Sequence, residues 1–212
     1  LSVVTGMDGT VTNTGTQHFH EGSKRLLDLR IMRMTTTTLQ SGVDCCQHAL
    51  CNYFVDGEKV SVSTLPIISR RKIGSKADFT LAKGQTLRVD KLCTVNTSRD
   101  QRWENEAYTV EALEAEGLAL VKEAEQLGFD ALMAESAAAW EQLWAKIDVQ
   151  VKDSDFDQLA IRFAQYHLNI FIKKEDNRVG IGAKGLSGEG YKGHSFWDTE
   201  IFILPYFILT QP

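Results

Sequence analysis

The stretch that decides the fold class of the first half of the chain is Thr86-Leu87-Arg88-Val89-Asp90-Lys91-Leu92-Cys93-Thr94-Val95-Asn96-Thr97. Its apolar residues of one parity are Leu87, Val89, Cys93 and Val95. Arg88 and Asp90 fall on the other parity. Because successive side chains of a strand point to opposite faces, the pattern predicts a half-buried strand with the Leu87 face packed and the Arg88 face in water.

Outward from this strand, the first 103 residues are typical of an all-β domain, because short β-prone runs recur with turn signals between them. Further strands are expected at residues 30–39, 48–55, 59–68 and 78–81. The turn signals are Ser41-Gly42, Asp56-Gly57, Ile73-Gly74-Ser75 and Lys83-Gly84. Asp56-Gly57 predicts a two-residue hairpin, since both central positions of a type I′ turn need positive φ. The first four residues resemble the middle of a strand, so we expect the chain to begin inside a longer protein.

From Glu104 onward the apolar residues recur with the period of a helix. Gly128 is expected to end one helix and Asp130 to cap the next. Ser154, followed by Asp157, predicts the capped start of a third helix. We therefore expect three parts: an all-β domain at 1–103, a helical linker at 104–150, and the beginning of another domain at 151–212.

Composition and charge exclude several classes of function. The chain has 212 residues, of which 43% are hydrophobic and 24% charged, as in globular proteins. The formal net charge is −5, and residues 104–157 hold 14 of the 28 acidic residues, which we assign to the solvated faces of helices. The basic residues elsewhere are spread out, so nucleic acid binding is not expected.

Membrane insertion and disulfide bonding are not expected either. The longest apolar run, residues 201–209, contains Pro205 and is much shorter than the roughly 20 residues that cross a bilayer. The cysteines have no C-x-x-C spacing, so reduced thiols and a cytoplasmic location are expected; they are Cys45, Cys46, Cys51 and Cys93.

The stretch from Gly185 to Glu200 carries the residues that favour a binding site, because glycines stand beside aromatic and acidic residues. An indole covers the apolar face of a pyranose, and a carboxylate accepts hydrogen bonds from its hydroxyls. Trp197 and Asp198 are the natural pair. The alternative is that Phe196 and Trp197 are core aromatics and Asp198 caps a buried helix.

Asp198 and Glu200 are not expected to act as the two carboxylates of a hydrolase. Positions i and i+2 point roughly 200° apart on a helix and share one face of a strand. Neither arrangement places the carboxylates on opposite sides of a glycosidic bond, as an inverting hydrolase requires. At most one of them is therefore expected to contact substrate.

Two other patterns carry no function. Gly180-Ile181-Gly182-Ala183-Lys184-Gly185 matches the dinucleotide spacing G-x-G-x-x-G, but more glycine follows it where that motif needs a helix. His18 and His20 have no second cluster of ligands nearby in the sequence, so no metal site is expected. No nucleophile elbow of the G-x-S-x-G type occurs.

Three segments resemble glycoside hydrolase family 65: residues 190–205, Met7 to Asn13, and Trp140 to Val149 together with Arg162 to Leu168. The resemblance implies an antiparallel β-sandwich, a helical linker and the first helix and loop of a six-hairpin α/α barrel. The sequence departs from the family in one respect: the sandwich is expected to lack its N-terminal strands, and so either to pack incompletely or to expose an edge that would normally be paired.

The same resemblance implies an inverting disaccharide phosphorylase that converts maltose and phosphate to β-glucose 1-phosphate and glucose. Residues 11–19 look most like maltose-acting members. Trp197 and Asp198 fall where the family holds the glucosyl unit, and His194 and Glu200 are candidates for support around it. The resemblance implies phosphate as co-substrate, no other cofactor, and a homodimer for the full enzyme.

The general acid and the phosphate-binding loop are expected beyond residue 212, so the chain alone is expected to be inactive. Two alternatives remain open at this stage. One is a non-catalytic carbohydrate-binding or assembly module, and the other is a family relative that uses water and is a glycoside hydrolase.

Overall fold

The computed structural model describes residues 1–185 and 190–211, apart from the side chain of Asn13. Residues 186–189 of the predicted binding stretch, which include Gly188, lie outside the described residues, as does residue 212. The chain divides into two compact units, Leu1–Leu132 and Met133–Pro212. In the parts that the structure describes, no helix has the length and apolar character needed to cross a membrane.

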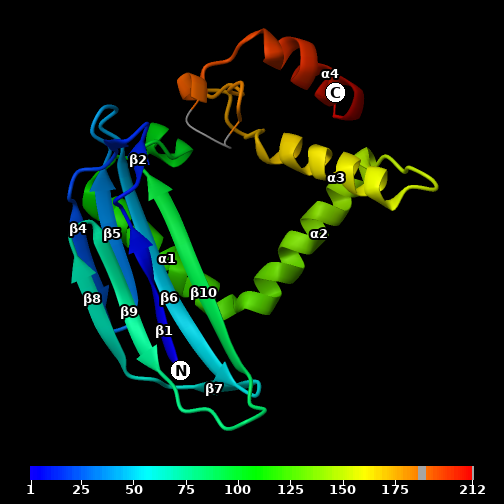
Figure 1. Cartoon of the computed structure of the whole chain (residues 1–212). Coiled ribbons are helices and arrows are strands. Elements are labelled where there is room, and N and C mark those ends of the chain that lie inside the picture. The colour runs from blue at the N-terminus through cyan, green and yellow to red at the C-terminus, as the bar shows by residue number, and fades with distance from the viewer. Residues whose placement is uncertain (186–189, 212) are drawn as a thin grey trace. The chain divides into compact units, whose positions relative to one another are not determined.

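The first unit contains two main antiparallel sheets (Figure 1). The larger has the strand order β10 (Leu87–Thr97), β6 (Asp44–Val55), β5 (Ile31–Thr37) and β4 (Ser23–Leu27), with β7 (Glu58–Val60) also paired to β6. The smaller has the order β1 (Ser2–Asp8), β9 (Lys72–Asp78) and β8 (Thr64–Ser69). A short ribbon joins β2 (Thr12–Asn13) and β3 (Thr16–Gln17). The predicted sandwich is confirmed.

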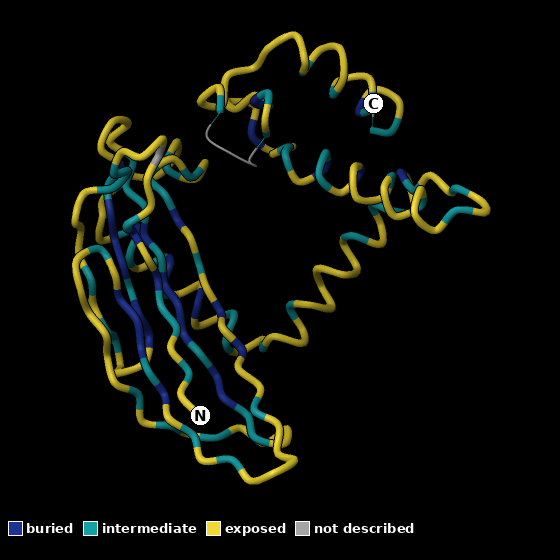
Figure 2. Tube along the Cα trace, viewed as in Figure 1, coloured by how far each residue is buried: buried dark blue, intermediate teal, exposed yellow. Residues whose placement is uncertain are grey.

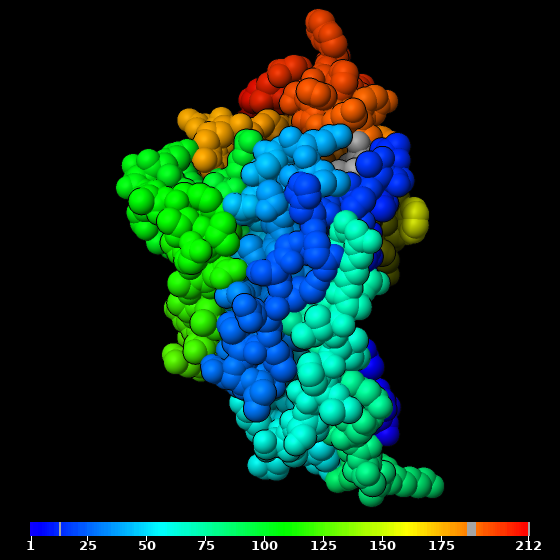
Figure 3. Space-filling model, turned by 90° about the vertical axis from the view of Figure 1, so that its left-hand side faces the viewer, coloured from blue at the N-terminus to red at the C-terminus, as the bar shows by residue number. Residues whose placement is uncertain are grey.

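Two hydrophobic cores lie on opposite faces of the larger sheet. Between the two sheets are Met7, Met32, Met34, Ala49 and Ile73. Between the larger sheet and helix α1 (Val110–Leu127) are Ile31, Leu50, Leu92 and Val121. Figure 3 shows these layers from the edge, with α1 in green, β4 and β5 in blue and β8 in teal, and Figure 2 shows the buried residues on the central strands.

The predicted packing face of β10 is wrong. The buried residues are Asp90, Leu92 and Asn96, whereas Val95 is 67% exposed. Helix α1 packs against β10 from the side that carries the polar residues. The buried carboxylate of Asp90 still has a hydrogen-bond partner there, because Arg88 Nε donates to its Oδ1 at 2.7 Å.

Two predicted strands are also misplaced. The run 59–68 is two strands, β7 and β8, and the strand expected at 78–81 is β9 at Lys72–Asp78. Gly74, predicted to lie in a turn, is inside β9 and pairs with Gly6 of β1. A Cβ on Gly6 would lie 2.5 Å from the Ile73 carbonyl oxygen, so the close approach of these strands requires glycine.

The predicted hairpin is confirmed. Asp56 and Gly57 have φ values of 50° and 89°, and the flanking residues Val55 and Glu58 pair. Both turn residues thus adopt the positive φ that a type I′ turn needs.

The three predicted helices are present as α1, α2 (Phe129–Ile147) and α3 (Asp155–Ile170). Gly128, with φ of 81°, ends α1 as expected. Asp130 lies inside the first turn of α2 and not at the cap, because α2 begins immediately after the glycine. The Ser154 Oγ accepts a hydrogen bond from the Asp157 amide at 3.3 Å, so the predicted cap of α3 is confirmed.

Candidate functional site

The segment that the sequence predicts to bind sugar follows a short 3-10 turn, η2 (Gly190–Gly193). Gly193 has φ of 76° and redirects the chain before Trp197 and Asp198 begin a helical segment. That segment continues as a π-helical turn, η3 (Thr199–Ile203), and ends as α4 (Leu204–Thr210). π-helical turns are frequent at functional sites.

The aromatic side chains of this segment are exposed. Trp197 is 80% exposed and Phe196 is 43% exposed. Asp198 forms no side-chain hydrogen bond that caps the following turn. Among the described residues, Trp197 is therefore not a core side chain and Asp198 does not cap the turn, and the sugar-binding interpretation of this segment stays a prediction.

All four residues predicted to form the site are exposed and lie in one short segment, residues 194–200. Asp198 has helical dihedral angles, and Glu200 lies two residues on in η3, so their side chains leave the backbone in nearly opposite directions. His194 contributes main-chain bonds: its amide donates to the Tyr191 carbonyl oxygen at 3.0 Å and its carbonyl oxygen accepts from Ala183 N at 3.2 Å. Among the described residues, no hydrogen bond or ion pair joins these four side chains to one another.

Two hydroxyl groups anchor the segment to an earlier part of the chain. Ser195 Oγ donates to the carbonyl oxygen of Ile181 at 2.8 Å, and Thr199 Oγ1 donates to the same oxygen at 3.0 Å. These residues flank Phe196, Trp197 and Asp198, so the tripeptide is held at both ends by one acceptor. The two hydroxyl residues on either side of the aromatic pair are visible in the sequence, but their shared acceptor is not.

The glycines of the dinucleotide-like motif have a packing role. A Cβ on Gly182 would lie 3.0 Å from the Cα of Gly193. A Cβ on Gly180 would lie 2.9 Å from Ser195 Oγ. Because each glycine lies against the segment that carries Trp197, the motif allows two pieces of backbone to pack closely.

The end of the segment is fixed to α3 by buried amides. Asn169 Nδ2 donates to the Tyr206 hydroxyl at 2.9 Å and to the Gln165 carbonyl oxygen at 2.8 Å. Gln211 Nε2 donates to Asn169 Oδ1 at 2.7 Å. Asn169 and Gln165 are only 7% and 4% exposed. Buried amides of this kind hold helices in one relative position because leaving them unpaired is costly.

A buried carboxylate organises the entry to the glycine-rich loop. Asp176 is 5% exposed and accepts hydrogen bonds from Arg178 Nε at 2.7 Å and Nη2 at 2.6 Å. Lys173 Nζ lies 3.5 Å from the same carboxylate. Hydrogen bonding to Arg178 holds the pKa of the Asp176 carboxyl well below its usual range, so this pair is ionised at neutral pH.

Chemically, this arrangement is suited to holding a sugar. An exposed indole next to a carboxylate offers a flat apolar surface and a hydrogen-bond acceptor on one helical turn. The second nearby carboxylate, Glu200, points elsewhere and cannot act across a bond that Asp198 also contacts.

Sequence models of two domains match the chain. The glycosyl hydrolase family 65 N-terminal domain matches residues 1–143, and the glycosyl hydrolase family 65 central catalytic domain matches residues 162–212.

Among curated proteins, the chain is 37% identical to a kojibiose phosphorylase of Halothermothrix orenii over 100% of the chain and 27% of that protein. It is 34% identical to a kojibiose phosphorylase of Escherichia coli over 99% of the chain and 27% of that protein. An alpha,alpha-trehalose phosphorylase of Geobacillus stearothermophilus is 40% identical over 45% of the chain and 12% of that protein. The chain thus spans about a quarter of the length of the relatives that it matches over its whole extent.

Among solved structures, a putative kojibiose phosphorylase from the human microbiome superposes with a TM-score of 0.82 at 20% identity, over 98% of this chain and 26% of that one. This likeness establishes that the two proteins share a fold.

Proposed function

The chain belongs to glycosyl hydrolase family 65, and on that premise we propose that it supplies the sandwich domain, the linker and the first part of the catalytic domain of an inverting disaccharide phosphorylase. The observation that carries the proposal for the site is the exposed indole of Trp197 beside Asp198 on a segment pinned by Ser195 and Thr199. In this proposal, Trp197 covers the glucosyl ring and Asp198 accepts hydrogen bonds from its hydroxyls.

The proposed reaction needs one protein acid and no protein base. An oxygen of phosphate, already anionic, forms the new bond to the anomeric carbon from the face opposite the leaving group. The glycosidic C–O bond breaks, and the acid transfers its proton to the departing oxygen. Neither Asp198 nor Glu200 is placed to share these roles, so we assign the acid and the phosphate-binding loop to parts of the enzyme outside these residues. The chain alone is then inactive.

The identity of the disaccharide substrate is a separate part of the proposal. The sequence favours maltose through residues 11–19, whereas the two relatives that match the whole chain are named kojibiose phosphorylases. We propose an α-linked diglucoside as the substrate, with kojibiose and maltose as the first pair to compare. The domain limits at residues 103 and 150, the α/α barrel, the homodimer and the cytoplasmic location stay predictions.

The test is Asp198→Ala in the complete enzyme that contains this chain, assayed for release of glucose 1-phosphate from each disaccharide with phosphate. Loss of a hydrogen bond to a charged group costs about 1.5–3 kcal/mol, so kcat/KM should fall by about 10- to 150-fold. Glu175→Ala removes an exposed carboxylate from the same unit and should leave kcat/KM unchanged. Equal activity of the two variants would remove Asp198 from the site, and release of glucose without glucose 1-phosphate would identify a hydrolase.

A further inference from the structure

The central strand β6 changes neighbours along one edge. Its pairing with β5 runs to Ala49, opposite Met32, and its pairing with β7 starts at Tyr53, opposite Val60. The other edge of β6 pairs with β10 throughout. Among the residues that the structure describes, residues 50–52 therefore have no strand partner on this side. The larger sheet has a gap here, in the middle of a buried strand.

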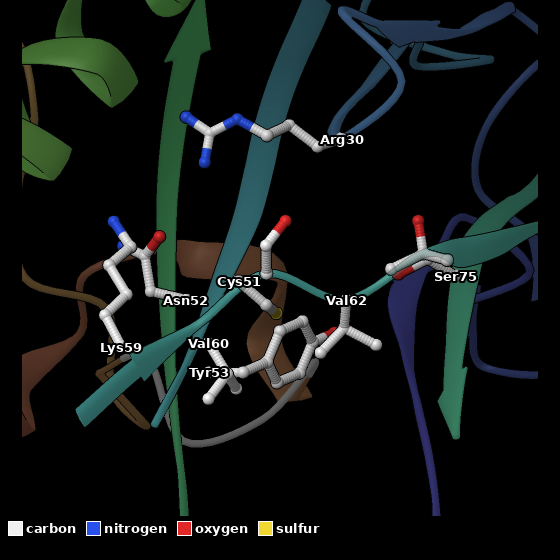
Figure 4. Close-up of a pocket in the computed structure, with 10 residues that line it drawn as sticks. Arg30, Cys51, Asn52, Tyr53, Lys59, Val60, Val62 and Ser75 are labelled. Carbon is white, nitrogen blue, oxygen red and sulfur yellow. The ribbon is translucent and has the colours of Figure 1, made fainter. Parts of the chain in front are cut away.

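A pocket of about 340 Å³ opens at this gap (Figure 4). Its volume falls within the range of about 300–1,000 Å³ that is typical of small-molecule sites. Figure 4 shows Arg30 on one side of the pocket, Lys59 and Asn52 on a second and Ser75 opposite them. Val60, Val62 and the ring of Tyr53 form an apolar floor, and the pocket is also lined by Cys51, Ser61 and Thr64.

One polar group of the pocket, the hydroxyl of Tyr53, is buried without a hydrogen bond to the described residues. Tyr53 is 5% exposed, and its hydroxyl forms no hydrogen bond within the described part of the chain. Asn52, which is 7% exposed, adds a side-chain amide to the wall. Because leaving buried polar groups unpaired costs free energy, a polar occupant of this space would be stabilised.

The charged residues of the lining are both cations. Arg30 Nη1 donates to Glu125 Oε1 at 2.8 Å, and Lys59 Nζ lies 3.7 Å from the same oxygen. One carboxylate thus faces two cations, and the separation from Lys59 exceeds hydrogen-bond length. The other acidic residues of the adjoining hollow, Asp90 and Asp130, are hydrogen-bonded to Arg88 at 2.7 and 2.8 Å, and its third, Glu125, is the carboxylate just described. The pocket therefore carries a local surplus of positive charge.

We propose that this pocket binds a small oxyanion, specifically a phosphate group, either free or carried on a sugar. Lys59, which shares the Glu125 carboxylate with Arg30, supplies positive charge, Asn52 and the nearby hydroxyls supply neutral hydrogen bonds, and the apolar floor accepts the carbon skeleton of a sugar. Lysine and arginine are common ligands of phosphate oxygens, and such bonds are stronger than neutral ones. The proposal uses only residues of the first unit, so it stands independently of the sugar site around Trp197.

The test is a titration of the ¹⁵N-labelled chain with inorganic phosphate, glucose 1-phosphate and glucose at low ionic strength, followed by amide NMR. A dispersed spectrum first establishes that each variant is folded. Both phosphate-bearing probes should shift the amides of residues 51–53 and 59–61, and glucose should not. Lys59→Gln should weaken phosphate binding about tenfold, the usual effect of one charge-assisted bond. Lys72→Gln, which removes a lysine paired with Asp8 outside the pocket, should not change it.

Any one of three outcomes of this titration would overturn the proposal. Phosphate could fail to shift these amides, Lys59→Gln and Lys72→Gln could weaken binding equally, or glucose could bind as well as glucose 1-phosphate. The first outcome leaves the proposed enzyme function intact, because that function rests on Asp198. Tighter binding of glucose 1-phosphate than of phosphate would identify the ligand as a phosphorylated sugar.

Discussion

Substituting Gly117 by alanine should destabilise the first unit although glycine lies in the middle of a helix. Gly117 is buried in α1. At a solvent-exposed helical position, Gly→Ala raises stability by about 1 kcal/mol. A Cβ at Gly117 would instead lie 2.6 Å from Nδ1 and 2.9 Å from Cε1 of His48, and 3.0 Å from Oδ1 of Asn96. Both neighbours are buried, at 0% and 5% exposure, so neither side chain can swing into solvent.

The size of the effect follows from two opposing terms. Forcing a methyl group into a packed core costs about 1–3 kcal/mol, and more when the neighbours cannot move. After subtraction of the helix gain of about 1 kcal/mol, we expect Gly117→Ala to lower the free energy of unfolding by about 0–2 kcal/mol, towards the upper end because His48 and Asn96 are buried. The measurement is urea unfolding of the chain followed by circular dichroism, with the midpoint and the m-value reported separately.

Two control variants isolate the cause. Ala119→Gly, at an exposed position of the same helix, measures helix propensity alone and should cost about 1 kcal/mol. In a His48→Ala background the main steric conflict is gone, so Gly117→Ala should become neutral or stabilising. The reasoning is refuted if Gly117→Ala stabilises the chain with His48 present, or if it costs the same in both backgrounds.

Two further predictions concern the anchor of the sugar site and the response to pH. Ser195→Ala combined with Thr199→Val should weaken glucosyl-ligand binding by the complete enzyme about tenfold, because each hydroxyl hydrogen bond contributes about 1 kcal/mol. The control is Thr210→Val, which removes a hydroxyl that bonds the carbonyl oxygen of Tyr206 on its own helix and should have no effect on binding. Equal losses of affinity in the two variants would contradict the anchoring role. Burial lowers the pKa of His48 to about 4. His48 is therefore protonated near pH 6.5 in the unfolded chain but only near pH 4 in the folded chain. Stability should therefore be full above pH 6.5 and decline by about 2–3 kcal/mol as the pH falls towards 4, and His48→Gln should flatten this part of the stability profile measured by urea unfolding at each pH; an unchanged profile would contradict it.

One turn and one helix cap could be predicted from the sequence, because their geometry depends on neighbouring residues alone. Asp56-Gly57 and Ser154 with Asp157 adopt the predicted geometry. The face of β10 that packs against the core could not be predicted from neighbouring residues. Counting apolar residues favours the Val95 face, but α1, more than ten residues further along the chain, covers the face with Asp90 and Asn96. Tertiary packing overrides the local pattern there.

The prediction of a strand at residues 78–81 in place of β9 was wrong for a related reason. Gly74 is a turn signal by composition, and only its pairing with Gly6, 68 residues earlier, shows that the glycine serves close strand approach. For the binding segment, residue types identified Trp197 and Asp198 as a pair, but the shared acceptor at Ile181 depends on a loop that folds back and leaves no local pattern. The gap beside residues 50–52 likewise depends on the registers of three strands.

Because β6 contributes alternate side chains to the two cores, with Ala49 on one side and Leu50 on the other, neither core can persist once this strand leaves the sheet. The sheets and α1 should therefore behave as one cooperative unit in hydrogen exchange, in which the amides of β6 open only with global unfolding. A slip of this strand by one residue would exchange the contents of both cores at once, so the same alternation that builds the domain also penalises its misfolded registers.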